Sequence, residues 1–94
     1  MKRDILELKE TVELMLSEDY KDRFKAEYYQ LKNRYDKLHA MLPKYEAGAD
    51  LGVPDLYLGF TPKTPLSTLK KQAIEMHDYL YSLEKRAAFE HIEL

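Results

Sequence analysis

The sequence contains no cysteine and no tryptophan, and it has few glycines and prolines. The absence of cysteine excludes disulfide bonds and thiolate metal sites, and it is common among proteins of the reducing cytosol. No apolar run approaches the roughly 18 residues that a transmembrane helix needs. The N-terminal stretch MKRDILELKETVELM also lacks the apolar segment of a signal peptide. We therefore expect a cytoplasmic protein with no membrane partner.

The chain also lacks a large excess of charge of either sign, since its net charge is −2 and its isoelectric point is about 5.9. Proteins that coat long nucleic acids depend on many contacts between cationic side chains and phosphates. We therefore expect no long nucleic acid as a partner. A small anionic ligand needs only two or three local cations, so this class of ligand stays open.

All the glycines and prolines lie between Pro43 and Pro65. Because proline fixes φ and removes a hydrogen-bond donor, while glycine loosens the backbone, this segment reads as a loop between two helical blocks. We predict one helical domain over residues 1–94. Its parts are an N-terminal helix at 1–16, a first long helix at 17–42, a loop at 43–64 and a last helix at 65–92.

Apolar residues recur at helical spacing in both blocks. Ser17 is a suitable N-cap for the first long helix, and Thr64 with Pro65 suits the start of the last one. One seam contains Tyr20, Phe24, Tyr28, Leu31, Tyr35, Leu38 and Leu42, and the other contains Leu69, Ala73, Met76, Leu80, Leu83 and Ala87. Two seams of similar length predict an all-α fold, an antiparallel helical hairpin with a short extra N-terminal helix.

Several apolar residues lie off these seams, namely Tyr29, Met41, Ile74, Tyr81, Phe89 and Ile92. A hairpin with one short extra helix buries little surface by itself. Another copy of the chain is the simplest cover for such residues. We therefore predict a homo-oligomer.

The sequence shows no arrangement typical of catalysis. His39, His77 and His91 lack the spacing of a metal site, and no phosphate-binding glycine loop or nucleophile elbow is present. We expect no enzyme activity, no cofactor and no bound metal.

Binding is the remaining class of function, and four residues are candidates for it. Tyr29, which has Lys25 and Lys32 close by on the helix, can stack on a base, or it can lie at a helix–helix contact. Its neighbour Tyr28 lies in the seam. Lys44 can close on an anion or stay solvated, and Arg86 can bind phosphate or pair with Glu90 four residues on.

Two ordered strings of residues then indicate a family. Residues 20–38 read Y-x-x-R-F-x-x-E-Y-x-x-L-x-x-R-Y-x-x-L, and residues 65–87 read P-x-x-x-L-x-x-Q-x-x-x-M-x-x-Y-L-x-x-L-E-x-R-A. The tripeptide Phe60-Thr61-Pro62 lies between them. From Ser17 to Leu94 the chain resembles the small helical crAss-phage-related proteins, a group that includes the anti-CBASS sponges.

This resemblance implies a phage protein of the host cytoplasm that forms an oligomer, typically a hexamer. Such sponges hold cyclic dinucleotides such as cyclic GMP–AMP, and some hold cyclic trinucleotides at a separate site, so that the CBASS effector is not activated. By resemblance, Tyr28 or Tyr29 would stack on a base, Lys44 would contact phosphate, and Arg86 would serve the trinucleotide site.

Two other functions remain open from the sequence. A helical protein-interaction module that docks a host or phage partner would use the tyrosines as interface anchors. A hydrolase of cyclic nucleotides is disfavoured because the sequence offers no metal-binding or general-base constellation.

Overall fold

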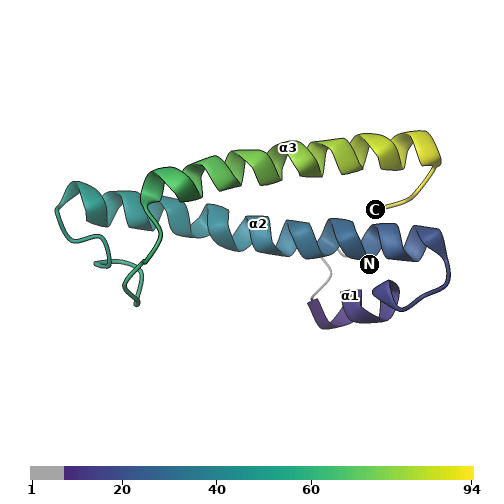
Figure 1. Cartoon of the computed structure of the whole chain (residues 1–94), viewed down its shortest axis with the longest axis horizontal. Coiled ribbons are helices and arrows are strands. Elements are labelled where there is room, and N and C mark those ends of the chain that lie inside the picture. Colours follow the sequence, from purple (N-terminus) through teal and green to yellow (C-terminus); the bar gives the residue numbers. More distant parts are fainter. Residues whose placement is uncertain (1–7) are drawn as a thin grey trace.

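The structure is a computed structural model of the chain, and it describes residues 8–94. These residues form three helices and no strand: α1 (Leu8–Met15), α2 (Tyr20–Asp50) and α3 (Leu66–Glu90). Helices α2 and α3 lie antiparallel, and α1 packs on α2 near the N-terminal end of α2 (Figure 1). The predicted all-α hairpin is confirmed. The first part of the helix expected at 1–16 lies outside the described residues.

Helix α2 begins two residues later than the position that the Ser17 cap predicted. Asp19 is the N-cap, and its carboxylate accepts a hydrogen bond from the backbone nitrogen of Lys21 at 2.8 Å. The Ser17 hydroxyl instead accepts from the Asp19 nitrogen at 3.1 Å and donates to the Asp22 carboxylate at 2.8 Å. Both residues are good cap formers, and the helix starts after the second of them.

The end of α2 differs more from the prediction, because the helix passes through Pro43 and continues to Asp50. The predicted start of the loop at residue 43 was wrong. Proline costs the helix one hydrogen bond, but contacts beyond it hold the added turns. Tyr45 is buried and its hydroxyl donates to the Thr64 carbonyl at 3.0 Å. Lys70 of α3 pairs with Glu46 at 2.6 Å.

Gly48 lies where the loop folds back against the last turn of α2. The Val53 nitrogen donates to the Gly48 carbonyl at 2.9 Å. A Cβ atom on Gly48 would lie 2.5 Å from the Val53 carbonyl oxygen, which is closer than van der Waals contact allows. This position therefore requires glycine for close packing of the backbone.

The core lies between α2 and α3 and is completed by the C-terminal tail. Its buried members are Phe24, Tyr28, Tyr29, Leu80, Leu83, Ala87 and Ile92. The central part of both predicted seams is therefore confirmed, while Tyr20 at the start of the first seam is exposed.

The apolar residues outside the seams separate into two groups. Tyr29 and Ile92 are buried within the chain, so they need no cover from another copy. Ile74, Tyr81 and Phe89 remain 63%, 63% and 77% exposed on α3. Met41 is half-buried on α2, so the exposed members of this set all lie on α3.

Helix α1 contacts α2 through a small polar centre. Thr11 is fully buried, and its hydroxyl accepts a hydrogen bond from the Gln30 side chain at 3.1 Å. Over the described part of the chain, no helix combines the length and the apolar character that a bilayer span demands.

Candidate functional site

Two of the clefts on the described surface of the hairpin contain predicted site residues. The first, here called the loop cleft, has a volume of about 400 Å³ and lies between α2 and the loop that follows it. It is lined by Lys37, Ala40, Met41, Lys44, Tyr57, Leu58 and Phe60. The second, here called the hairpin cleft, has a volume of about 250 Å³ and lies between α2 and α3. It is lined by Tyr28, Lys32, Tyr35, His77, Leu80, Tyr81 and Glu84.

The loop cleft combines positive charge with exposed aromatic rings. Lys37 and Lys44 are seven residues apart, so two helical turns bring them to the same face of α2. Opposite them, Tyr57 and Phe60 are 52% and 53% exposed. No carboxylate lines this cleft, and neither lysine forms an ion pair with a described residue. Such a lining suits a ligand with negative charge and flat rings.

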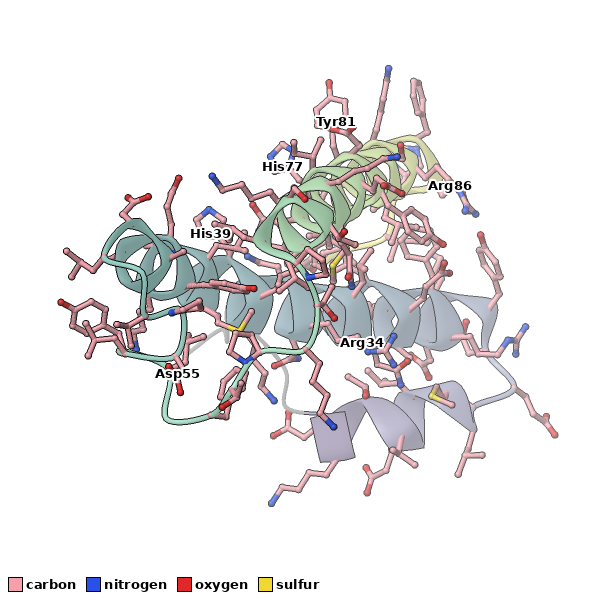
Figure 2. All side chains as sticks on the ribbon, turned by 60° about the vertical axis from the view of Figure 1, so that its left-hand side comes forward. Arg34, His39, Asp55, His77, Tyr81 and Arg86 are labelled. Carbon is pink, nitrogen blue, oxygen red and sulfur yellow. The ribbon has the colours of Figure 1, made fainter. Side chains whose placement is uncertain are left out.

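Hydrogen bonds within the loop hold these rings near α2. The Leu58 nitrogen donates to the Asp55 carbonyl at 3.2 Å, and the Asp55 carboxylate accepts from the Thr61 hydroxyl at 3.4 Å. Asp55 lies on the loop at the far end of the hairpin from α1 (Figure 2). Together with the bond from Tyr45 to Thr64, these contacts make the loop a folded wall of the cleft.

The hairpin cleft is aromatic as well, but its charges are mixed. The Tyr35 ring stacks on His39 at 5.3 Å between ring centres, and it lies 6.0 Å from the His77 ring. Lys32 is 5.9 Å from the centre of the Tyr35 ring and pairs with Asp36 at 2.9 Å. Since Glu84 also lines this cleft, its positive charge is largely offset.

Tyr28 and Tyr29, the two candidates for base stacking, lie in the core. They are 9% and 5% exposed, and their rings meet edge to face at 5.0 Å between centres. For Tyr29, the sequence left open a position at a helix–helix contact, and this is the position that the structure shows. Burial, with a further contribution from Glu84, raises the pKa of Tyr28 to about 12. The small exposed part of Tyr28 lines the wall of the hairpin cleft.

Lys44 lies on α2 rather than at the start of a loop, and it lines the loop cleft. At 1.5 Å per residue, it is about 24 Å along the helix from Tyr28. A single chain therefore does not bring Lys44 together with Tyr28 or Tyr29.

Arg86 lies near the opposite end of the hairpin and is already engaged. Its guanidinium donates to the Tyr20 hydroxyl at 2.7 Å and to Glu90 at 3.3 Å, and it lies 5.0 Å from the centre of the Phe24 ring. The interaction with the Tyr20 hydroxyl is the main cause of a raised pKa for Arg86. The ion pair with Glu90 that the sequence offered is thus present.

Sequence reasoning did not assign Lys37, Tyr57 or Phe60 to a site. Lys37 could have been found from its spacing of seven residues from Lys44, which predicts that both lysines lie on the same face of a helix. Tyr57 and Phe60 lie within the segment that was predicted only as a loop. Their position over α2 depends on where α2 ends, and the sequence did not reveal this.

Residues 8–94 contain no group of three side chains placed to hold a metal ion. The fold and the clefts define a small all-α hairpin protein whose surface hollows combine lysines with aromatic rings.

The family model Sequestin matches residues 18–89, and because this is most of the chain, the protein belongs to the Sequestin family. The match covers α2, the loop and α3 and starts after α1, close to Ser17, where the resemblance to a sponge-type family began. No curated protein and no solved structure matches the chain.

Proposed function

We propose that this protein is a phage anti-defence protein that binds and sequesters cyclic oligonucleotide second messengers without cleaving them. Its ligands would be cyclic dinucleotides such as cyclic GMP–AMP, and also cyclic trinucleotides, so that CBASS effectors in the host cytoplasm are not activated. The name of its family, Sequestin, supports a sequestering role. The resemblance of its two motifs to the anti-CBASS sponges supports the choice of ligand.

The observation that carries the proposal is the loop cleft. Lys37 and Lys44 present positive charge on one wall, and half-exposed Tyr57 and Phe60 present flat faces on the other. Stacking of a base on an aromatic ring contributes about 1–3 kcal/mol. A hydrogen bond to a charged group contributes about 1.5–3 kcal/mol. A nucleotide uses both kinds of contact at once.

The size of the loop cleft favours a shared site. Its volume of about 400 Å³ lies near the lower end of small-molecule sites, which run from about 300 to 1,000 Å³. A cyclic dinucleotide carries two bases and two phosphates in nearly two-fold symmetry. We therefore propose that two copies each hold one half of the ligand, within a homo-oligomer that is typically a hexamer in the proteins it resembles.

Arg86 has a different place in this proposal. It lies apart from both clefts, and a ligand that uses it would have to compete with Glu90 for the guanidinium. A phosphate can replace the Glu90 carboxylate, because both groups accept paired hydrogen bonds from the guanidinium of arginine. A trinucleotide site at Arg86 is therefore proposed as separate from the loop cleft.

A helical protein-interaction module is the second candidate function. The exposed side chains of Ile74, Tyr81 and Phe89 favour it, because apolar residues on an outer helix face are typical of docking surfaces. This function requires no small-molecule ligand.

Titration calorimetry with a panel of cyclic di- and trinucleotides tests the proposal, followed by recovery of the ligand from denatured protein. We expect binding by at least one member and recovery of that ligand intact. No heat from any member would favour the interaction module, and a linear product in the recovered pool would indicate an enzyme.

Variants locate the site. Lys44→Ala and Lys37→Ala should each weaken dinucleotide binding by about 10- to 100-fold, as expected for loss of one charge-assisted contact. Phe60→Ala should weaken it by a similar factor through lost stacking. Lys63→Ala is the matched control, because Lys63 is an exposed lysine of the same loop segment outside the cleft. Equal affinity of all four variants would exclude the loop cleft as the binding site.

A further inference from the structure

The outer side of α3 carries a continuous stripe of five exposed residues. This outer stripe consists of Ile74, Asp78, Tyr81, Lys85 and Phe89. Their spacing of four, three, four and four residues places them on one face of a helix. Figure 2 shows Tyr81 pointing away from α2, at the edge of the stripe that borders the hairpin cleft. Within residues 8–94, no other helix covers the stripe.

The two charged residues of the stripe are available for pairing. Lys85 forms no ion pair with a described residue. The side chain of Asp78 is 76% exposed and has only a long contact of 3.7 Å with its neighbour His77. One acid and one base thus lie between three large apolar side chains.

The order of these residues is self-complementary. When two copies of α3 pack antiparallel with a two-fold axis midway between Tyr81 and Ser82, Asp78 lies opposite the partner's Lys85. Lys85 then lies opposite the partner's Asp78. The same symmetry places Ile74 opposite the partner's Phe89, and Tyr81 lies beside the axis. Every member of the stripe meets a suitable neighbour in this register. A shift by one residue in one direction would bring Asp78 opposite the partner's Glu84, and a shift in the other direction would bring Ile74 opposite the partner's Glu90.

We propose that the outer stripe is a two-fold interface at which α3 pairs antiparallel with α3 of a second copy of this chain. Charge complementarity selects the second copy over an unrelated partner, because the stripe supplies both members of each ion pair. The interface specifies the self-association included in the proposed function, and it does not depend on the ligand. Tyr81 belongs to the stripe and also lines the hairpin cleft, so pairing brings the two hairpin clefts together beside the axis.

Charge reversal tests this interface by sedimentation velocity over a concentration series. Asp78→Lys places two like charges opposite each other at both ends of the pair, and Lys85→Asp does the same with acids. Each single variant should weaken the association through α3 on the order of 100-fold. The double variant, Asp78→Lys with Lys85→Asp, restores both ion pairs in reversed polarity and should recover association to within about tenfold of the original.

The controls reverse the same charges away from the stripe. Asp50→Lys at the end of α2 and Lys63→Asp in the loop segment should associate like the original chain. Circular dichroism checks that all variants remain helical. A monomeric original chain would overturn the proposal and leave the stripe to a different protein. Single reversals without effect, or a double variant that stays dissociated, would also overturn it.

The outcome is separable from that of the ligand experiments. Normal association with no nucleotide binding would contradict the proposed function and leave the interface intact. If the chain binds nucleotide but charge reversal at Asp78 and Lys85 leaves its association unchanged, the interface alone is contradicted.

Discussion

At the scale of single residues, the tyrosines show how position decides which part of a side chain is used. Tyr28 buries its ring in the core, whereas Tyr45 buries its ring and also donates its hydroxyl to the loop. Tyr57 leaves half of its surface exposed beside two lysines. The same side chain therefore serves as core, as a tie for the loop or as a recognition surface, depending on burial.

The raised pKa of Tyr28 leads to a prediction about alkaline stability. The phenol ionises near 10.0 in the unfolded chain and near 12 in the folded one, because burial disfavours its charged form. Between these values the folded state holds a proton that the unfolded state has lost, so the free energy of unfolding falls as pH rises. Below pH 10 this contribution is fully present.

Removing the Tyr28 hydroxyl should reduce that fall. Urea unfolding of Tyr28→Phe over the alkaline range should show a smaller pH dependence than the original chain. Part of the dependence will remain, because hydrogen bonds to Glu90 and Glu27 raise the pKa of Tyr20 and of Tyr79 respectively. An identical pH dependence in both proteins would contradict the assigned burial of the Tyr28 phenol.

At the scale of elements, the end of α2 determines the loop cleft. The helix runs beyond Pro43 because Tyr45 and Glu46 contact residues at the start of the last helical segment. The loop then folds back onto Gly48 and carries Tyr57 and Phe60 over the lysines of α2. A helix that stopped at residue 42 would have left Lys44 in the loop and only Lys37 on the helical wall of the cleft.

Gly48→Ala should therefore destabilise the protein, although alanine is the better helix former. The added Cβ would clash with the Val53 carbonyl, and overpacking of this kind costs about 1–3 kcal/mol. The midpoint of thermal unfolding should fall by roughly 4–8 °C for each kcal/mol. Ala47→Gly, at the exposed neighbouring position, measures the helix-propensity contribution by itself. A stabilised Gly48→Ala protein would show that the loop does not pack there.

At the scale of the whole molecule, α2 separates two contacts with different roles. On one flank it packs with α3 to form the hairpin, and on another it holds α1 through buried Thr11 (Figure 1). The Sequestin match covers the hairpin and starts after α1. The two contacts should therefore be separable by mutation.

Thr11→Glu should release α1 while leaving the hairpin folded. A carboxylate at this fully buried position must lose its hydration, which is costly, and it replaces the hydroxyl that accepts from Gln30. A released α1 of 8 residues is too short to stay helical alone. Amide hydrogen exchange should accelerate in α1 but not in the centres of α2 and α3, and the free energy of unfolding should fall by about 1–3 kcal/mol. Glu13→Thr, on the exposed side of α1, is the control. Faster exchange throughout α3 would show that the helices form one cooperative unit.

The amount of this structure that could be predicted from the sequence differs between core and site. The spacing of Phe24, Leu80 and Leu83 predicted the faces that meet in the hairpin, because side chains three or four residues apart share a helix face. The helix ends were harder to predict. A cap at Ser17 and a break at Pro43 were reasonable from local preference, but Asp19 caps the helix instead, and tertiary contacts of Tyr45 and Glu46 hold the turns beyond Pro43. For the site, Lys44 was named early, but its neighbours Lys37 and Phe60 were not.

The sequence by itself thus determined the all-α class, the hairpin and its buried seams, since these follow from a periodicity that is local to each helix. Only the tertiary structure decided that Tyr29 is buried, that the loop covers the lysines of α2, and that Ile74, Tyr81 and Phe89 share an uncovered face. The physical reason is that these features depend on contacts between residues far apart in the chain, and one helix's periodicity carries no information about which surface another segment will cover.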